Sequence, residues 1–360
     1  MPWLVTRHQD VRALLADPRA SADIRREGYP HTSASARARR TRGVTFISMD
    51  DPEHARLRRM VRGTFALRRV QALRPSIQQV VDERIDALLT GPRPVDLVAA
   101  FALPVPSQVI CHLLGVPYAD HDFFQQRSRI LIARDQPVEQ AMAAQDDLIE
   151  YLDRIIARKL ADPADDLLSS LAAEHVATHE LSRREAARMA LLLLVAGHET
   201  TANMIALGTL ALFEHPDQLA AVRDTDDPAL IAGAVEELLR YLSIAHSGRR
   251  RTALEDIEID GQIIHAGDGI VLADEAANRD EARFPDPDGL DVTRNARGHL
   301  AFGFGVHACL GQPLARVELQ VVYGTLYRRI PGLRLAVALK QIPFKHDSNI
   351  YGVYELPVTW

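Results

Sequence analysis

A cysteine between glycines, directly before a helical pattern, is the residue in this sequence best suited to chemistry. Cys309 lies in the segment Phe302–Gly311 (FGFGVHACLG), and Gln312-Pro313 then begins the helical pattern. The glycines let the backbone bend closely around the sulfur, and the N-terminal end of the following helix favours a thiolate. The other cysteine, Cys111, is distant in sequence and sits in an apolar segment. A local zinc or iron–sulfur site is therefore excluded, and a single axial thiolate to haem iron remains.

Polar residues in the middle of a long apolar helix form a second candidate site. Ser182 and Glu185 form a capping-box pattern, and the helical periodicity continues until His215-Pro216. At about 1.5 Å per residue such a helix is roughly 45 Å long, so it must be mostly buried. Its middle is nevertheless Ala196–Thr201 (AGHETT), where glycine and polar groups are unfavourable. Two interpretations stay open: a local opening of the helix toward a ligand or water, or a kinked core helix with Glu199 in a buried ion pair.

Two pairs of charged residues lie at helical spacing. Glu237 and Arg240 are three residues apart, so they can pair on one helix. His54 and Arg58 share one face of a helix that begins after Asp51-Pro52. Taken alone, each pair is typical of a solvated helix surface.

Helical periodicity dominates the elements that must position these residues. The short strand signals are a hairpin at 257–264 with an Asp-Gly turn and an extended piece at 353–359. Residues 23–44 and 278–300 are predicted to be irregular. The pattern does not alternate strands and helices, so the expected fold class is mainly α with a small β portion, as a single domain over residues 1–360. The predicted helices cover residues 11–15, 68–89, 106–114, 141–160, 185–213, 228–242 and 313–330.

Composition narrows the class of protein further. The 42 Lys and Arg residues against 48 Asp and Glu give a net charge of −6, which argues against nucleic-acid binding. Two cysteines rule out a disulfide scaffold and favour a reducing compartment. The N-terminal residues do not resemble a signal peptide, and the longest apolar run, 189–197, is too short to span a membrane. We expect a cytoplasmic protein that does not bind a membrane.

In their order and spacing these motifs resemble those of the cytochrome P450 superfamily of haem-thiolate monooxygenases. The resemblance covers essentially the whole chain and is greatest to the soluble actinomycete type. It implies the P450 fold, with a long central helix over haem b. It also implies that the first helix and first strand of the family are absent here. The matching positions are Phe302, Gly305, Cys309 and Gly311 in the cysteine loop, Ala196 to Thr201 in the long helix, and Glu237 with Arg240.

The resemblance implies a role for each matching residue. Cys309 is expected to be the proximal ligand of the haem iron, and the acid–alcohol pair Glu199 and Thr200 to deliver protons to bound oxygen. Glu237 and Arg240 are expected to form a structural pair. Further cofactor-binding positions are Ala196, Gly197, Phe302, Gly303, Gly305 and Gly311 at the haem, and His54, Arg58, Arg251 and His299 at its propionates.

The resemblance further implies a monooxygenase that hydroxylates or epoxidises a small lipophilic molecule of secondary metabolism. O2 is the co-substrate, and a ferredoxin with its ferredoxin reductase supplies the electrons to a monomeric enzyme. Residues 23–44 and the helices between 118 and 171 are expected to cover the substrate. The alternatives are an oxidative coupling catalyst and a peroxide-driven haem enzyme. A non-catalytic haem sensor or binding protein is disfavoured, because no output domain is recognisable in the sequence.

Overall fold

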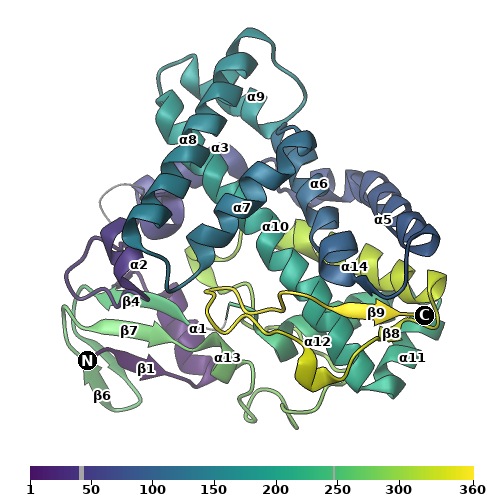
Figure 1. Cartoon of the computed structure of the whole chain (residues 1–360). Coiled ribbons are helices and arrows are strands. Elements are labelled where there is room, and N and C mark those ends of the chain that lie inside the picture. The colour runs from purple at the N-terminus through teal and green to yellow at the C-terminus, as the bar shows by residue number, and fades with distance from the viewer. Residues whose placement is uncertain (40–43, 246–247) are drawn as a thin grey trace.

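The longest helix, α10 (Arg183–Glu214), runs through the centre of the molecule, and other helices surround it (Figure 1). The computed structural model describes residues 1–39, 44–245 and 248–360. The other helices are α1 (His8–Ala16), α2 (Ala34–Arg39), α3 (Glu53–Arg62), α4 (Leu67–Ala72), α5 (Arg74–Thr90), α6 (Pro104–Leu114), α7 (His121–Ile132), α8 (Val138–Ala161), α9 (Leu167–Leu171), α11 (Pro216–Asp224), α12 (Pro228–Leu242), α13 (Asp274–Ala277) and α14 (Gln312–Arg329).

Helix α10 begins and ends where the sequence predicts. The Ser182 side chain accepts a hydrogen bond from the Glu185 backbone, and the Glu185 carboxylate binds the Ser182 N–H, which completes the capping box. Of the two interpretations of its middle, the local opening does not occur, because Arg183–Glu214 is one unbroken α-helix. By length and composition α10 could cross a membrane, but 72% of its most apolar window is buried, as expected for a core helix.

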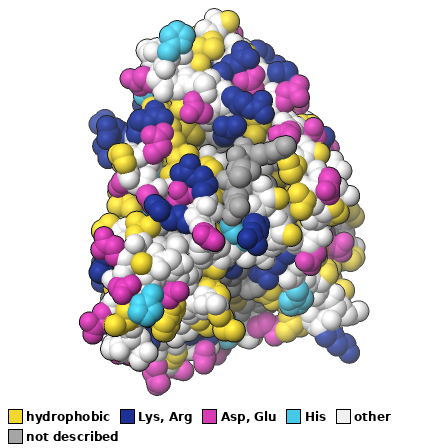
Figure 2. Space-filling view, turned by 90° about the vertical axis from the view of Figure 1, so that its left-hand side faces the viewer, with side chains coloured by type: hydrophobic (Ala, Val, Ile, Leu, Met, Phe, Trp, Pro, Cys, Tyr) yellow, Lys and Arg dark blue, Asp and Glu magenta, His cyan; other side chains and the backbone are white. Residues whose placement is uncertain are grey.

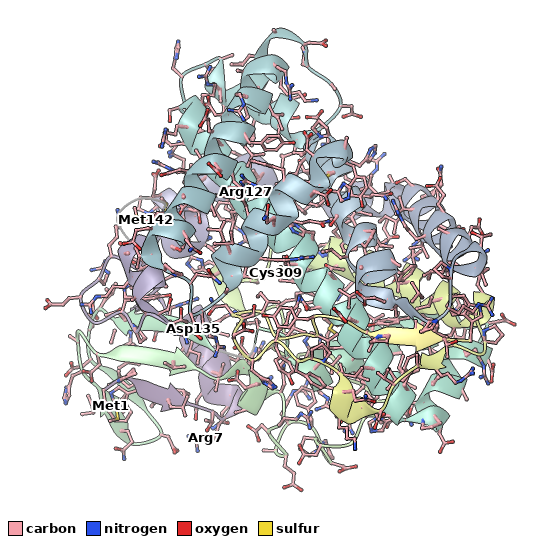
Figure 3. All side chains as sticks on the ribbon, in the orientation of Figure 1. Met1, Arg7, Arg127, Asp135, Met142 and Cys309 are labelled. Atoms are coloured by element: carbon pink, nitrogen blue, oxygen red, sulfur yellow. The ribbon has the colours of Figure 1, made fainter. Side chains whose placement is uncertain are left out.

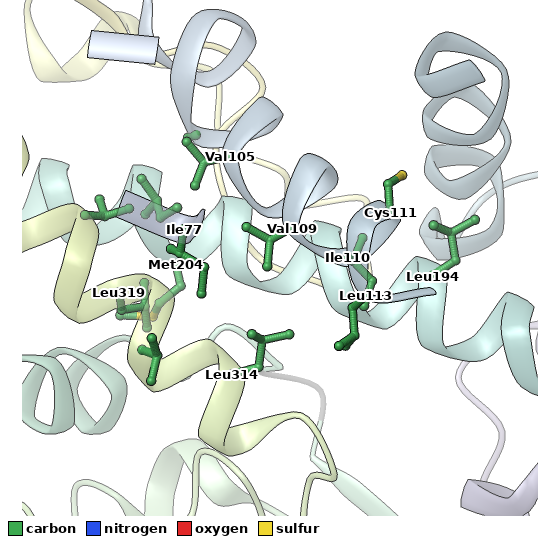
Figure 4. Close-up of a cluster of buried hydrophobic side chains, with 14 of the residues drawn as sticks. Ile77, Val105, Val109, Ile110, Cys111, Leu113, Leu194, Met204, Leu314 and Leu319 are labelled. Carbon is green, nitrogen blue, oxygen red and sulfur yellow. The ribbon is translucent and has the colours of Figure 1, made fainter. Parts of the chain in front are cut away.

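Three helices, α5, α6 and α14, contribute to the main core beside this central helix. Apolar side chains of α5, α6 and α14 pack around α10, as the close-up in Figure 4 shows. Glycine is required on α10 at two of these contacts. A Cβ at Gly197 would lie 2.6 Å from the side chain of Ile110, and one at Gly208 would lie 1.9 Å from the Tyr323 hydroxyl. The two glycines therefore allow α6 and α14 to approach α10 closely.

Small sheets lie at the edge of the helical body (Figure 1). In the four-stranded sheet the order is β1-β7-β4-β2, and β1 pairs in parallel with β7, with Trp3 opposite Ile270. The predicted hairpin is confirmed as β5 and β6, and Asp260 and Gly261 both have positive φ, as an Asp-Gly hairpin turn requires. The strands are β1 (Trp3–Val5), β2 (Ala20–Ser21), β3 (Val95–Asp96), β4 (Arg249–Ala253), β5 (Ile257–Ile259), β6 (Gln262–Ile264), β7 (Gly269–Leu272), β8 (Arg334–Leu335) and β9 (Pro357–Thr359).

Two predicted segments differ from the structure. The single helix predicted for 68–89 is divided into α4 and α5, which begins at Arg74-Pro75. Proline lacks an N–H and favours the first turn of a new helix, so it restarts the helix here. The predicted loop at 23–44 contains the short helix α2, and its residues 40–43 lie outside the described part of the chain.

A completely buried ion pair holds the long irregular segment 278–300 in place. Arg240 and Glu237 are both inaccessible to solvent and form two hydrogen bonds of 2.7 Å. The Arg240 guanidinium also donates to the carbonyls of Asn278, at 2.9 Å, and Pro287, at 2.8 Å. Glu237 in turn binds Arg294. The predicted pair is therefore confirmed, and it supplies the partners that a segment without helices or strands otherwise lacks.

Replacing Arg240 with methionine should destabilise the protein strongly. The change leaves Glu237 buried without its main partner, at a cost of about 3–5 kcal/mol in the free energy of unfolding. Arg328→Met is the matched control, because Arg328 pairs with the fully exposed Asp226 and should cost less than about 1 kcal/mol. Urea unfolding of both variants measures the difference. Similar losses of unfolding free energy in the two variants would show that the buried pair stabilises the protein no more than the exposed pair does.

Candidate haem site

The cysteine loop is shaped around the sulfur of Cys309, which lies near the middle of the molecule (Figure 3). The Cys309 N–H donates to the Phe302 carbonyl at 2.8 Å, which closes the loop. Gly305 has a φ of 73°, and a Cβ there would lie 2.6 Å from the Leu15 carbonyl oxygen. At the start of α14, the N–H groups of Gly311 and Gln312 point at the sulfur.

The electrostatics at Cys309 favour a thiolate only when a cation binds it. The side chain is exposed, but it opens into an internal cavity. Burial raises the pKa of the Cys309 thiol, whereas the Gly311 N–H and the guanidinium groups of Arg249 and Arg58 lower it. Burial raises the pKa of Cys111 to about 12, so that thiol is inert. A metal ion in the cavity would supply the positive charge that the Cys309 thiolate needs.

The cavity lies between the cysteine loop and α10 and has a volume of about 180 Å³. The structure thus brings together two motifs that are about 110 residues apart in the sequence. Gly303 and Gly305 do not line the cavity; they form the turn that leads to it, with positive φ at both. The predicted residues that line the cavity are Ala196, Gly197 and Thr200 on α10, and Arg58, Phe302, Cys309 and Gly311 opposite.

Basic side chains gather beside the Cys309 loop. The rings of His54 and His307 lie 4.1 Å apart, and Arg58 donates to the Ala308 carbonyl at 2.6 Å. His54 Nε2 and His307 Nδ1 are buried and have no hydrogen-bond partner among the described residues. Burial and the nearby Arg251 and His54 lower the pKa of His307 to about 3. Such buried groups without partners indicate a site for an anionic ligand.

His299 does not belong to this cluster, and the prediction that it holds a propionate needs correction. Its Nε2 lies 3.1 Å from Glu236, which also binds Arg316 on α14. Sequence reasoning missed His307, which does belong to the cluster. The position of His307, two residues before Cys309, could have indicated this role, because a tight loop places residues close to the cysteine next to the group that the cysteine binds.

The polar residues of α10 are held mainly by the helix itself. Thr200 Oγ1 donates to the Ala196 carbonyl at 2.8 Å. His198 is buried, and its Nδ1 lies 2.6 Å from the Leu194 carbonyl. A carbonyl can only accept, so Nδ1 carries the proton, and burial lowers the pKa of this histidine. Nε2 of the neutral ring then lies 3.8 Å from the Glu199 carboxylate.

A segment near the C-terminus adds a cation close to Glu199. Lys345 Nζ donates to Asn203 Oδ1 at 3.0 Å, and Asn203 Nδ2 donates to the Glu199 carbonyl at 2.6 Å. The charge of Glu199 raises the pKa of Lys345, although burial lowers it more. Gly352 makes room for this contact, because a Cβ there would lie 1.7 Å from Asn203 Oδ1. Sequence reasoning missed Lys345, since nothing in the local sequence marks it.

Together these features fit a flat, doubly anionic cofactor with one sulfur ligand. The cavity has α10 on one side and the sulfur on the other, and the unpartnered histidines lie beside the two arginines. Haem has this shape, two carboxylates and an iron that takes an axial ligand. The fold and the donor set therefore define a haem-thiolate protein.

Comparison with known proteins gives the family. The sequence profile of the cytochrome P450 family matches residues 3–330, so the chain belongs to this family. It is a haem b monooxygenase of mainly helical fold. The chain is 57% identical to cytochrome P450 GfsF of Streptomyces halstedii, over 100% of this chain and 87% of the relative. It is 51% identical to pentalenic acid synthase of Streptomyces avermitilis, over 99% of this chain and 88% of that enzyme.

Solved structures agree with this assignment. The crystal structure of GfsF superimposes with a TM-score of 0.94 and covers 100% of this chain and 90% of its own. The mycinamicin VIII C21 methyl hydroxylase MycCI from Micromonospora griseorubida, bound to mycinamicin VIII, is 43% identical. Its TM-score is also 0.94, and the match covers 99% of this chain and 90% of that one. Both comparisons confirm the predicted fold.

Replacing His307 with leucine should weaken haem retention more than replacing His299 with glutamine. His307→Leu removes a buried group that faces the anion site, and such a charge-assisted hydrogen bond contributes about 1.5–3 kcal/mol. His299→Gln keeps a donor for Glu236. The rate of haem transfer to apomyoglobin should rise about tenfold or more for the first variant only. The reverse order would restore His299 as the propionate ligand.

Proposed function

We propose that this enzyme hydroxylates or epoxidises a small lipophilic molecule of secondary metabolism. In this proposal O2 is the co-substrate, and an external ferredoxin with its reductase supplies electrons in the cytoplasm. One observation carries the proposal: Thr200 on the core helix lines both the cavity that holds the Cys309 thiol and the neighbouring cavity that Glu199 lines. The relatives add support, since one is named a synthase of pentalenic acid and another a methyl hydroxylase.

A larger cavity next to Thr200 suits an apolar substrate. This cavity, the substrate pocket, has a volume of about 470 Å³. Glu199 and Thr200 line it at α10, and the apolar run 189–196 supplies part of its wall. The segments expected to cover the substrate contribute to it, through residues 24–36 and helices α7 and α8. Its apolar lining includes Ile24, Ile47, Leu131, Leu191, Val195 and Ile350.

The residues of this chain can be assigned to separate tasks. Haem, when bound, supplies the activation of O2 and the oxidation itself. Cys309 would hold the iron from the α14 side, with its negative charge stabilised by the N–H groups of Gly311 and Gln312. The Thr200 hydroxyl donates a hydrogen bond to the Ala196 carbonyl, so its oxygen can accept a hydrogen bond from the cavity. Glu199 would hold the proton that Thr200 passes into the cavity.

The reduced, CO-bound protein should show the red-shifted Soret band that a thiolate ligand produces. Cys309→His should lose this band, because imidazole replaces sulfur as the ligand. Cys111→Ser is the control and should keep it, since Cys111 is buried in the core away from the cavity. A spectrum typical of histidine ligation in the unmodified protein would contradict the proposed ligand.

Replacing Thr200 with alanine should uncouple electron consumption from product formation. Without the hydroxyl the proton path is broken, so NAD(P)H oxidation continues while product per electron pair falls by about tenfold or more and hydrogen peroxide rises. Thr200→Ser keeps the hydroxyl and should restore most of the coupling. The ratio of product to NAD(P)H, measured with a surrogate ferredoxin, decides the matter. Unchanged coupling in Thr200→Ala would remove this residue from the proton path.

A further inference from the structure

The substrate pocket is mainly apolar, but two arginines line it: Arg188 on α10 and Arg250 on β4. Both side chains are half-buried. A guanidinium group is always charged in proteins, and its removal from water is unfavourable without a partner. The positive charge in this otherwise lipophilic space therefore requires an explanation.

Arg188 has no ion pair or hydrogen bond in the part of the chain that the structure describes. Its Nε is buried and has no acceptor. Glu185 lies one turn earlier on the same helix, but its carboxylate binds Ser182 in the capping box. Arg188 thus interacts with Glu185 through its charge alone, and its buried Nε–H lines the pocket without an acceptor.

Arg250 is also free of carboxylate partners among the described residues. Its NH1 group donates to the Gly248 carbonyl at 3.1 Å. Burial and the positive charge of Arg134 lower the pKa of Arg250, and the charges of Tyr29 and Glu275 oppose this effect. The strand neighbours of Arg250 have other surroundings, since Arg249 contacts Asp274 and the charge of Arg251 acts on His307 in the cysteine loop.

Among the described residues that line the pocket, one carboxylate, that of Glu199, faces these two positive charges and does not balance them. Glu199 lies at the end of the pocket near Thr200, and its negative charge is already close to Lys345. Arg188 is twelve residues before Thr200, or roughly 18 Å along the helix axis. The end of the pocket that is distant from the reaction centre is therefore the cationic one.

We propose that the substrate is an amphiphilic acid, with an apolar body and a carboxylate that Arg188 binds. This inference rests on the proposed function and names its substrate class. The planar fork of guanidinium N–H groups matches the two oxygens of a carboxylate. Arg250 adds to the positive field of the pocket but already donates to a backbone carbonyl. Because Arg188 and Thr200 lie at opposite ends of the pocket, oxidation occurs at a carbon distant from the carboxylate.

The test compares acids with their neutral amides. Dodecanoic acid and dodecanamide form a linear pair, and abietic acid and its primary amide form a polycyclic pair of nearly equal shapes. Isothermal titration calorimetry on the haem-loaded enzyme at pH 7.5 measures binding, and the Soret shift is followed in parallel. At least one acid should bind about tenfold more tightly than its amide, and this preference should weaken as salt increases.

Arg188→Gln should abolish the preference for the acid while leaving the affinity for the amide unchanged. Arg184→Gln is the matched control, since Arg184 is an exposed arginine on the same helix. Equal affinities for acid and amide in both pairs, or no binding of either acid, would overturn the proposal. A preference that persists in Arg188→Gln would overturn the assignment to Arg188. The CO spectrum of each variant reports separately on haem-thiolate ligation, so failure of the proposed function is distinguishable.

Discussion

The structure depends on one constraint, the placement of negative charge inside an apolar protein. A thiolate and two haem carboxylates are costly to bury unless donors and cations surround them. The turn before α14 directs two N–H groups at the Cys309 sulfur. His54 and Arg58 on α3, Arg251 on β4 and His307 in the cysteine loop surround the site on the other sides. Segments distant in sequence must therefore meet at one cavity, and the remaining helices hold them there.

The irregular segment before the cysteine loop shows how this placement is made rigid. Residues 278–300 contain neither helix nor strand, so their backbone groups need partners from elsewhere. Arg240 supplies several donors from inside α12. The Asn278 side chain accepts from the Leu300 N–H at 2.7 Å, which connects this segment directly to the start of the cysteine loop. The buried ion pair thus holds in place a segment whose own backbone hydrogen bonds do not.

The basic and acidic side chains interspersed on the face shown in Figure 2 contribute much less to the stability of the fold, because they remain solvated.

Much of the fold was predictable because local rules decided it. The capping box and Pro216 set the limits of α10, and the Asp-Gly turn set the hairpin. The motifs at Ala196–Thr201 and Cys309 could be assigned to one site through their order and spacing. The direction of individual side chains could not be predicted. His299 and His307 lie in the same segment, and only the path of the backbone decides which one faces the haem. The importance of Arg188 and Arg250 could not be predicted either, because arginine is abundant in this chain and only their half-buried position without a carboxylate partner distinguishes them.

The pairing of β1 with β7 has a consequence for how the protein is made. Trp3 lies opposite Ile270, so about three quarters of the chain separates these neighbouring strands. During synthesis the first strand leaves the ribosome long before its partner exists. The sheet that carries Arg251 on β4 therefore forms late, after α5, α6 and α10 have been synthesised. Until then the N-terminal segment must remain unpaired without aggregating, and its short length of three residues limits that risk.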